Sequence, residues 1–453
     1  MAIWFDDSRV RGAYTSQNAA VVTAALASII AAVLYVAGPA VLQIALLALF
    51  ICTAQLRPVA TFVVVGIFFA IALSPLVIAV RDFTGSYASV ITVFGIAWFV
   101  NVLIMGTALS TPSRWRPVCV VLGVVALSVS PLASVAVVSV LPFAGVLFPG
   151  SGTAGLLLLL GAIALLVSRV RMLPIASVLA GSLMAQAVYS APMSIESVDT
   201  HSIVGLDTAD GAPSVMERQA FRVVMLESKR DQVLTTLKGV TGTTGAITVV
   251  FPESAFGYWN LSVAQQLGEF ADGTHRSVTV LGGARLTIAT RDSDSRALFI
   301  HVLINAVTGK ILYEQQNPIP GLHRLAIERH NETYTERHTQ QKVAAAFPVA
   351  GQGTRRELGF GVLICGELIN AWRSFRTFSE KTDTVIWIAN LGWTDQSYFK
   401  KRLTLTAKRW GRLYNTRVIT AVNSSPAASS PLSTLSDFSV PGELARNWGS
   451  SGA

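Results

Sequence analysis

Charge is scarce in this sequence, but only in its first part. Charged residues make up 13% of the 453 residues, and hydrophobic residues make up 52%. Soluble globular proteins usually carry about 25% charged residues. Residues 1–192 hold 8 Lys+Arg and 3 Asp+Glu, whereas residues 193–453 hold 27 and 23. The composition therefore predicts a membrane domain over 1–192, followed by a water-soluble region that is long enough for a complete core.

Cysteine is also rare. Of the three cysteines, Cys52 and Cys119 lie in apolar segments, which leaves Cys365 alone in the second part. This excludes a disulfide framework there. The net charge of +9 is shared as +5 and +4 between the two parts, and no basic stripe is interleaved with aromatic residues. Direct binding of nucleic acid is therefore not expected.

Two motifs suggest a metal or a nucleotide only at first sight. His330 and His338 lie in the polar segment 323–342, where no Cys or Asp completes a ligand set. We interpret this segment as a solvated loop or helix, with a lid near a site as the alternative. The G-x-G-x-x-G pattern at 150–155 lies between apolar segments and is typical of a flexible turn there. No cofactor and no metal are expected.

Seven apolar segments lie within residues 1–192. Each is long enough, or nearly so, to cross about 30 Å of hydrocarbon as a helix. They are 18–36, 40–56, 59–80, 88–108, 117–146, 154–168 and 172–191. The segment 117–146 exceeds one straight crossing and contains Pro131 and Pro142, which favours a tilt, a kink or a partial re-entry. The sequence predicts about seven transmembrane helices.

The arginines between these segments predict the orientation. If all seven segments cross, only Arg81, next to Asp82, falls on one side. The arginines on the other side are Arg9, Arg11, Arg57, Arg114, Arg116, Arg169 and Arg171. The positive-inside rule then places the N-terminus in the cytoplasm. In a Gram-negative bacterium, residues from 193 onward would lie in the periplasm, attached to the inner membrane.

Residues 193–423 have the pattern of an α/β domain. An amphipathic helix is expected at 213–238, and a second helix at 404–416. Short runs rich in Val and Ile predict buried strands. These runs are 246–251, 277–284, 297–306, 359–365, 384–390 and 417–423. Residues 424–453 are rich in Ser, Pro and Ala and are expected to be a loosely ordered tail.

Three of these strands end in polar residues that stand out. Glu253 follows the first in a Pro-Glu pair, Cys365-Gly366-Glu367 follows the fourth, and Asn390-Leu-Gly-Trp393 follows the fifth. Any one alone is weak, because a lone cysteine after an apolar run is usually a core residue. Ligands of α/β sheets bind beyond the carboxyl ends of the strands. Together the three predict a site.

In this order, the three motifs resemble the nitrilase (carbon–nitrogen hydrolase) superfamily, which folds as an α-β-β-α sandwich. The resemblance is specific over about 245–425. A polytopic membrane domain followed by such a domain is similar to the membrane-anchored branch of that superfamily. That branch includes the apolipoprotein N-acyltransferases and the conjugal transfer proteins of Ti-type plasmids.

The resemblance implies roles for individual residues. Cys365 would be the nucleophile, Glu253 the general base, and the N–H of Gly366 an oxyanion donor. Gln315 stands at the position of the family's catalytic lysine, and either Lys310 or Arg285 could supply the missing charge. Residues Glu367, Asn390 and Trp393 would complete the oxyanion or substrate-binding site.

Three functions follow as alternatives. The first is an inner-membrane accessory protein of plasmid conjugal transfer, whose periplasmic domain acts on an amide or acyl group or only binds it. The second is an enzyme like apolipoprotein N-acyltransferase. The third is a membrane scaffold that keeps the fold without catalysis. The expected partners are membrane lipid and components of the conjugation apparatus or pilus.

Overall fold

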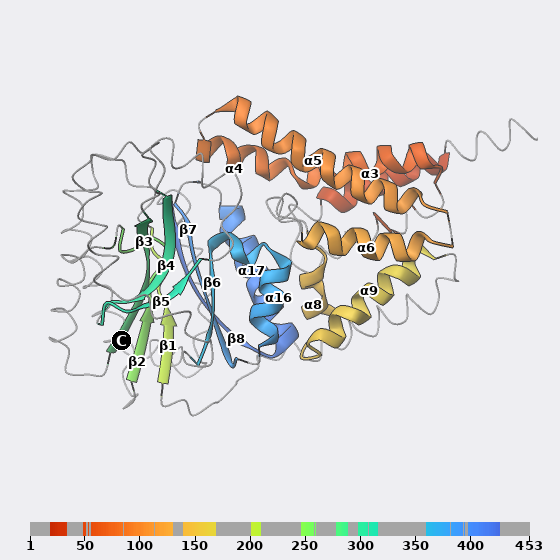
Figure 1. Ribbon diagram of the computed structural model, residues 1–453. Coiled ribbons are helices and arrows are strands. Elements are labelled where there is room, and N and C mark those ends of the chain that lie inside the picture. The colour runs from red at the N-terminus through yellow and green to blue at the C-terminus, as the bar shows by residue number, and fades with distance from the viewer. Residues whose placement is uncertain are drawn as a thin grey trace, which may run out of the picture.

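Figure 1 shows the computed structural model, which places two sheets beside a group of helices. The structure describes residues 19–33, 49–50, 53, 56–84, 86–112, 114–129, 139–168, 201–209, 246–257, 259, 278–288, 298–306, 308–315, 359–380, 382–392, 394 and 397–425. Several predicted features lie outside them: the helix at 213–238, the segment 323–342 with His330 and His338, Trp393, the apolar segment 172–191 and most of 40–56.

Residues 19–168, called the helical half below, contain short and long apolar helices. They are Ala19–Val33, α3 (Pro58–Ala72), α4 (Ser74–Thr84), α5 (Tyr87–Ser110), α6 (Arg116–Val129), α8 (Ala144–Leu147) and α9 (Thr153–Val167), with a 3₁₀ turn, η2, at Leu141–Phe143. Pro58 opens α3, where a missing N–H leaves no hydrogen bond unmade. The side chain of Ser86 caps α5 by accepting from the N–H of Ser89.

Among the described residues, α5 alone is long and apolar enough to cross a membrane as a single helix. The pair α3 and α4 would make a second crossing with a 48° bend between them. The helices Ala19–Val33, α6 and α9 are apolar but shorter. The prediction of about seven crossings stays a prediction. The turn expected at 150–155 is shorter than predicted: Gly150 and Gly152 have positive φ, and α9 already begins at Thr153.

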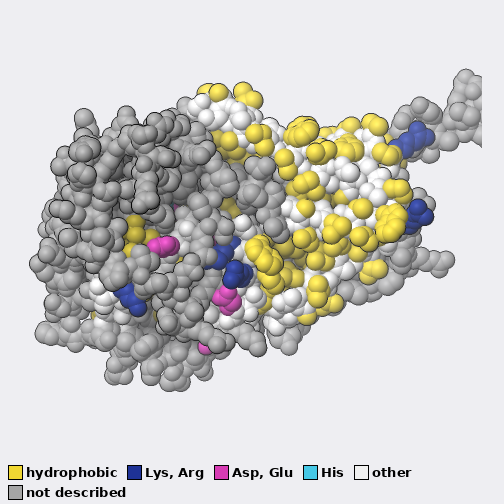
Figure 2. Space-filling model, in the orientation of Figure 1, with side chains coloured by type: hydrophobic (Ala, Val, Ile, Leu, Met, Phe, Trp, Pro, Cys, Tyr) yellow, Lys and Arg dark blue, Asp and Glu magenta, His cyan; other side chains and the backbone are white. Residues whose placement is uncertain are grey.

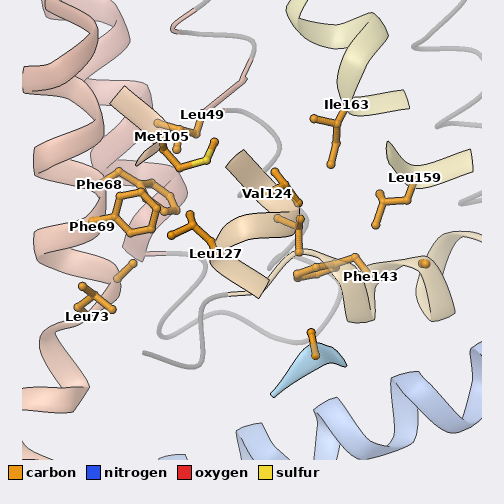
Figure 3. Packing of buried hydrophobic residues seen from close by; sticks show 14 of the residues in the cluster. Leu49, Phe68, Phe69, Leu73, Met105, Val124, Leu127, Phe143, Leu159 and Ile163 are labelled. Atoms are coloured by element: carbon orange, nitrogen blue, oxygen red, sulfur yellow. The ribbon is translucent and has the colours of Figure 1, made fainter. Parts of the chain in front are cut away.

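The helical half is apolar both inside and outside. Its interior is packed by side chains from α3, α5, α6, η2 and α9, including Phe68, Met105, Leu127, Phe143 and Leu159 (Figure 3). Hydrophobic side chains also cover much of the face of this half that Figure 2 shows. Of the exposed large hydrophobic residues among those described, all except Trp372 belong to this half.

The C-terminal region forms two sheets. The first has the order β1-β2-β3-β4-β5, from the strands His201–Gly205, Ala246–Val250, Val278–Ile288, Leu298–Asn305 and Ile311–Glu314. β1, β2 and β3 are parallel, and the following two pairings are antiparallel. The second is parallel, β6-β7-β8, from Gly361–Ile364, Thr384–Leu391 and Arg417–Ser424. The six predicted strands are confirmed, whereas β1 and β5 were not predicted.

The two sheets pack face to face and share one apolar layer. That layer includes Val250 and Leu303 from the first sheet and Ile364, Ile388 and Ala421 from the second. Helices α16 (Ala371–Ser379) and α17 (Ser397–Tyr414) cover the other face of the second sheet (Figure 1). This region therefore combines strands and helices, and α17 extends the helix expected at 404–416. Assignment to the nitrilase-like α-β-β-α sandwich stays a prediction.

Helix α17 also joins the sheets to the helical half. The N–H groups of Gly150 and Gly152 donate to the carbonyls of Arg412 and Leu413, both at 2.8 Å. The guanidinium of Arg409 lies 4.4 Å from the centre of the Phe143 ring. A second contact joins α4 to the segment after β7, where the hydroxyl of Thr394 donates to Asp82 at 3.1 Å. The two halves thus share continuous packing.

Candidate active site

Four of the predicted site residues come together where strands of the two facing sheets end. Glu253 follows β2, Gln315 follows β5, Cys365 follows β6, and Asn390 lies at the end of β7. They are far apart in the chain, and the positions of three of them after predicted strands are the reason that their proximity was expected. It arises because the first sheet packs on the second, which brings the ends of β2 and β5 to the ends of β6 and β7.

Glu253 lies at the centre of the group, with only 3% of its surface exposed. Its carboxylate contacts the imidazole Nδ1 of His301 and the thiol of Cys365, and it accepts from the N–H of Asn390 at 2.9 Å. Burial by itself raises the pKa of Glu253. The His301 charge and the hydrogen bonds from His301, Cys365 and Asn390 outweigh it, so the pKa lies below the ordinary value of a glutamate. Glu253 is therefore ionised and can accept a proton.

Cys365 is the first residue of the 3₁₀ turn η3 (Cys365–Leu368), which follows β6 directly. Its φ of +47° falls in the left-handed region, which a residue with a side chain rarely adopts. Such strain is typical of functional positions. The dehydrated surroundings and the Glu253 carboxylate raise the pKa of the Cys365 thiol, while the N–H groups of Asn390 and Gly366 act in the opposite direction. The thiol therefore keeps its proton until Glu253 removes it.

Three side chains fix the backbone of this turn. The N–H of Ile364 donates to Glu367 at 2.9 Å, and the carbonyl of Ile364 accepts from Gln315 Nε2 at 3.2 Å. The carbonyl of Cys365 accepts from Trp387 Nε1 at 3.2 Å. These bonds give two of the predicted site residues a structural task. Gln315 and the fully buried Glu367 fix the backbone of Ile364, the residue before Cys365.

Glu367 belongs to a buried network with Tyr313 and Arg373. The hydroxyl of Tyr313 lies 3.0 Å from both carboxylate oxygens of Glu367, and Arg373 Nε lies 3.8 Å from one of them. Arg373 also donates to the Tyr313 hydroxyl. Burial, followed by the Glu367 carboxylate, raises the pKa of Tyr313, so the phenol stays neutral. Among the described residues of this network, Glu367 and Arg373 carry the charges, and each is hydrogen-bonded.

Asn390 connects the site to the second sheet. Its N–H serves Glu253, while its side-chain oxygen accepts from the N–H of Gly392 at 3.1 Å and from Asn423 Nδ2 at 3.0 Å. Asn423 in turn accepts from the hydroxyl of Thr208 at 2.9 Å. Asn390 therefore positions the base through its backbone. The predicted partner of this motif, Trp393, lies outside the described residues.

His301 was missed by the sequence reading. It lies on β4, opposite Arg285 of β3, and its carbonyl accepts from the N–H of Gln315 at 2.8 Å. The signal was a single ionisable residue inside the apolar run ALFIHVLINA. Of the two cations that were considered for the site, Arg285 donates to the hydroxyl of Ser254 at 3.2 Å. Lys310 is exposed at the start of β5, whereas Gln315 follows the end of this strand.

The geometry supports one kind of chemistry. An ionised carboxylate beside a protonated thiol can act as a general base toward a nucleophile. The backbone N–H groups of Gly366 and Asn390 favour the charged form of the thiol, because they lower the pKa of Cys365. Such an arrangement suits attack on an acyl carbon, with release of an amine or alcohol.

Comparison with known proteins identifies a distant relative. The chain is 26% identical over 311 residues to a probable conjugal transfer protein TraB of Sinorhizobium fredii (strain NBRC 101917 / NGR234). The match covers 69% of this chain and 74% of that protein. No family model matches the sequence. The predicted similarity to the conjugal transfer protein TraB is confirmed at this level, whereas membership of the nitrilase superfamily stays a prediction.

The buried network predicts a large loss of stability in Glu367→Gln. The substitution keeps the shape of the side chain but leaves the charge of Arg373 buried without a counter-charge. We expect the free energy of unfolding to fall by about 3 kcal/mol, measured by denaturation of the purified full-length protein in detergent.

The matched control is Glu380→Gln on the same helical region. Glu380 pairs with Arg376 at 3.7 Å, and the Arg376 side chain is 64% exposed. An exposed pair of this kind contributes about 0.5 kcal/mol or less. Equal losses in the two variants would contradict the assigned role of Glu367.

Proposed function

We propose that this chain is an inner-membrane component of plasmid conjugal transfer, and that its nitrilase-like C-terminal domain acts on an acyl or amide group through Cys365. The contact between the Glu253 carboxylate and the Cys365 thiol carries the chemical part of the proposal. The similarity to a probable conjugal transfer protein, over 69% of the chain, supports the biological part.

The reaction begins with one proton transfer. Glu253 accepts the proton from the Cys365 sulfur, and the sulfur attacks the carbonyl carbon of the substrate. The C–S bond forms while the carbonyl electron pair moves to oxygen, where the N–H of Gly366 is a candidate donor. When the intermediate collapses, the leaving amine or alcohol takes the proton from Glu253. Water or an acceptor amine then releases the acyl group from sulfur.

The membrane location is supported by the surface of the helical half. Contiguous apolar surface on this scale is typical of contact with lipid or with another protein. The exposed fractions are 73% for Ile91, 58% for Phe99 and 61% for Leu122, on two adjacent helices. A membrane anchor of this kind would bring Cys365 near lipid acyl groups, which makes phospholipid a candidate acyl donor.

The predicted orientation agrees with the contacts between the halves. Seven crossings would put the turn after Arg81 and the turn at 148–152 on the same side as the C-terminal domain. Asp82 contacts Thr394, and Gly150 and Gly152 contact α17. At the other ends of the helices, the hydroxyl of Ser110 donates to the carbonyl of Pro58 at 3.4 Å. These contacts favour a single, consistent sidedness.

Plasmid transfer between cells tests the function. Cys365→Ala, which removes the nucleophile, and Glu253→Gln, which removes the base but keeps its shape, are expected to lower the transfer frequency by about 100-fold or more. Transfer is counted as recipients per donor, with the variant supplied to a plasmid that lacks the native gene.

Cys119→Ala is the matched control, because Cys119 is a free cysteine on α6, outside the site. It should transfer as the unchanged protein does, at equal membrane abundance. Normal transfer with both site variants would refute a catalytic role and leave the scaffold as the function.

Reporter fusions test the orientation. Alkaline phosphatase, which needs disulfides formed in the periplasm, is expected to be active when fused after residue 200. The matched fusion after residue 112, between α5 and α6, should be inactive. Activity of the second fusion without the first would reverse the proposed topology.

A further inference from the structure

Glu253 and Cys365 together carry one negative charge that neither of them neutralises. Before proton transfer the negative charge lies on Glu253, and afterwards it lies on the Cys365 sulfur. Either way, one negative charge stays in a largely dehydrated place, because Glu253 is 3% exposed. An unpaired buried charge is strongly unfavourable. Gln315, which holds the backbone before Cys365, is neutral and cannot balance it.

His301 is placed to balance this charge. Its Nδ1 forms an ion-pair contact with Oε1 of Glu253, while Cys365 hydrogen-bonds the same carboxylate. The His301 side chain is 14% exposed, so water screens the contact only in part. His301 lies two residues before Leu303 on β4, and Gln315 lies two residues after Tyr313, just beyond the end of β5. β4 and β5 pair with each other, and the N–H of Gln315 donates to the carbonyl of His301. Since Leu303 and Tyr313 face the second sheet, His301 and Gln315 face it too.

We propose that His301, as an imidazolium, is the positioning residue that supplies the positive charge of this site. It keeps its own proton while the thiol proton passes from the Cys365 sulfur to an oxygen of Glu253. The imidazolium therefore offsets the Glu253 carboxylate before the proton transfer and the Cys365 thiolate after it. The charges of these three side chains sum to zero in both states. This inference rests on the function proposed above, because it takes Cys365 as the nucleophile.

Other charged groups near His301 belong to the neighbouring elements. Arg285 is its cross-strand partner on β3 and is tied to the Ser254 hydroxyl at 3.2 Å. Glu253 comes from the end of β2, and Cys365 from the turn after β6. Of the basic side chains in these contacts, His301 is the one that touches the Glu253 carboxylate.

The test measures the reactivity of Cys365 itself, so no substrate has to be known. Full-length protein in detergent is alkylated with iodoacetamide, and the Cys365 and Cys119 peptides are quantified by mass spectrometry over time. In His301→Gln we expect the alkylation rate of Cys365 at neutral pH to fall by about tenfold or more. The reason is that a thiolate destabilised by one pKa unit is populated about tenfold less. Cys119 should keep its rate.

Two further variants separate charge from structure. Gln315→Lys, added to His301→Gln, returns a cation on the neighbouring strand and should restore most of the rate. Lys310→Gln removes an exposed cation from the same hairpin and should change nothing.

Unfolding would raise the alkylation rate, so it cannot imitate the expected loss. A His301→Gln rate equal to or above that of the unchanged protein at every pH would overturn the inference. A slower rate that the added Gln315→Lys does not restore would overturn it as well. Neither outcome touches the proposed function, which fails only if transfer proceeds without Cys365.

Discussion

The contact between the carboxylate of Glu253 and the thiol of Cys365 is the interaction on which the rest of this structure depends. The two residues come from different sheets, so the contact exists only when the sheets are packed face to face. Neither group is reactive alone, since the thiol keeps its proton and the carboxylate is a weak nucleophile. Together they form a base and a nucleophile that share one proton.

The surrounding residues have two separate tasks around this contact. Glu367, Gln315 and Trp387 hold the strained backbone on both sides of Cys365. His301 and the N–H of Asn390 instead stabilise the negative charge of Glu253. Different groups therefore hold the backbone around Cys365 and stabilise the charge of Glu253, as preorganised sites require.

Much of this could be predicted from the sequence, for a physical reason. Buried strands read as apolar runs, and the polar residues that end them stand out, which identified Glu253, Cys365 and Asn390. β5 was missed because its four residues, ILYE, are only alternately buried and form no continuous apolar run. β1 was missed because its five residues, HSIVG, contain only two large apolar side chains. His301 was missed because a side chain inside a strand shows its partners only after the sheets pack. The same packing changed the role of Gln315, whose amide donates to Ile364.

The most direct test of the Glu253–Cys365 pair is to trap the acyl group on sulfur. Purified full-length protein would be incubated with a p-nitrophenyl ester of a fatty acid, and the acylated peptides identified by mass spectrometry. The acyl group should appear on Cys365, remain absent from Cys119, and form far more slowly in Glu253→Gln. Acylation of Cys365 at the same rate with and without the Glu253 carboxylate would contradict the pairing of base and nucleophile.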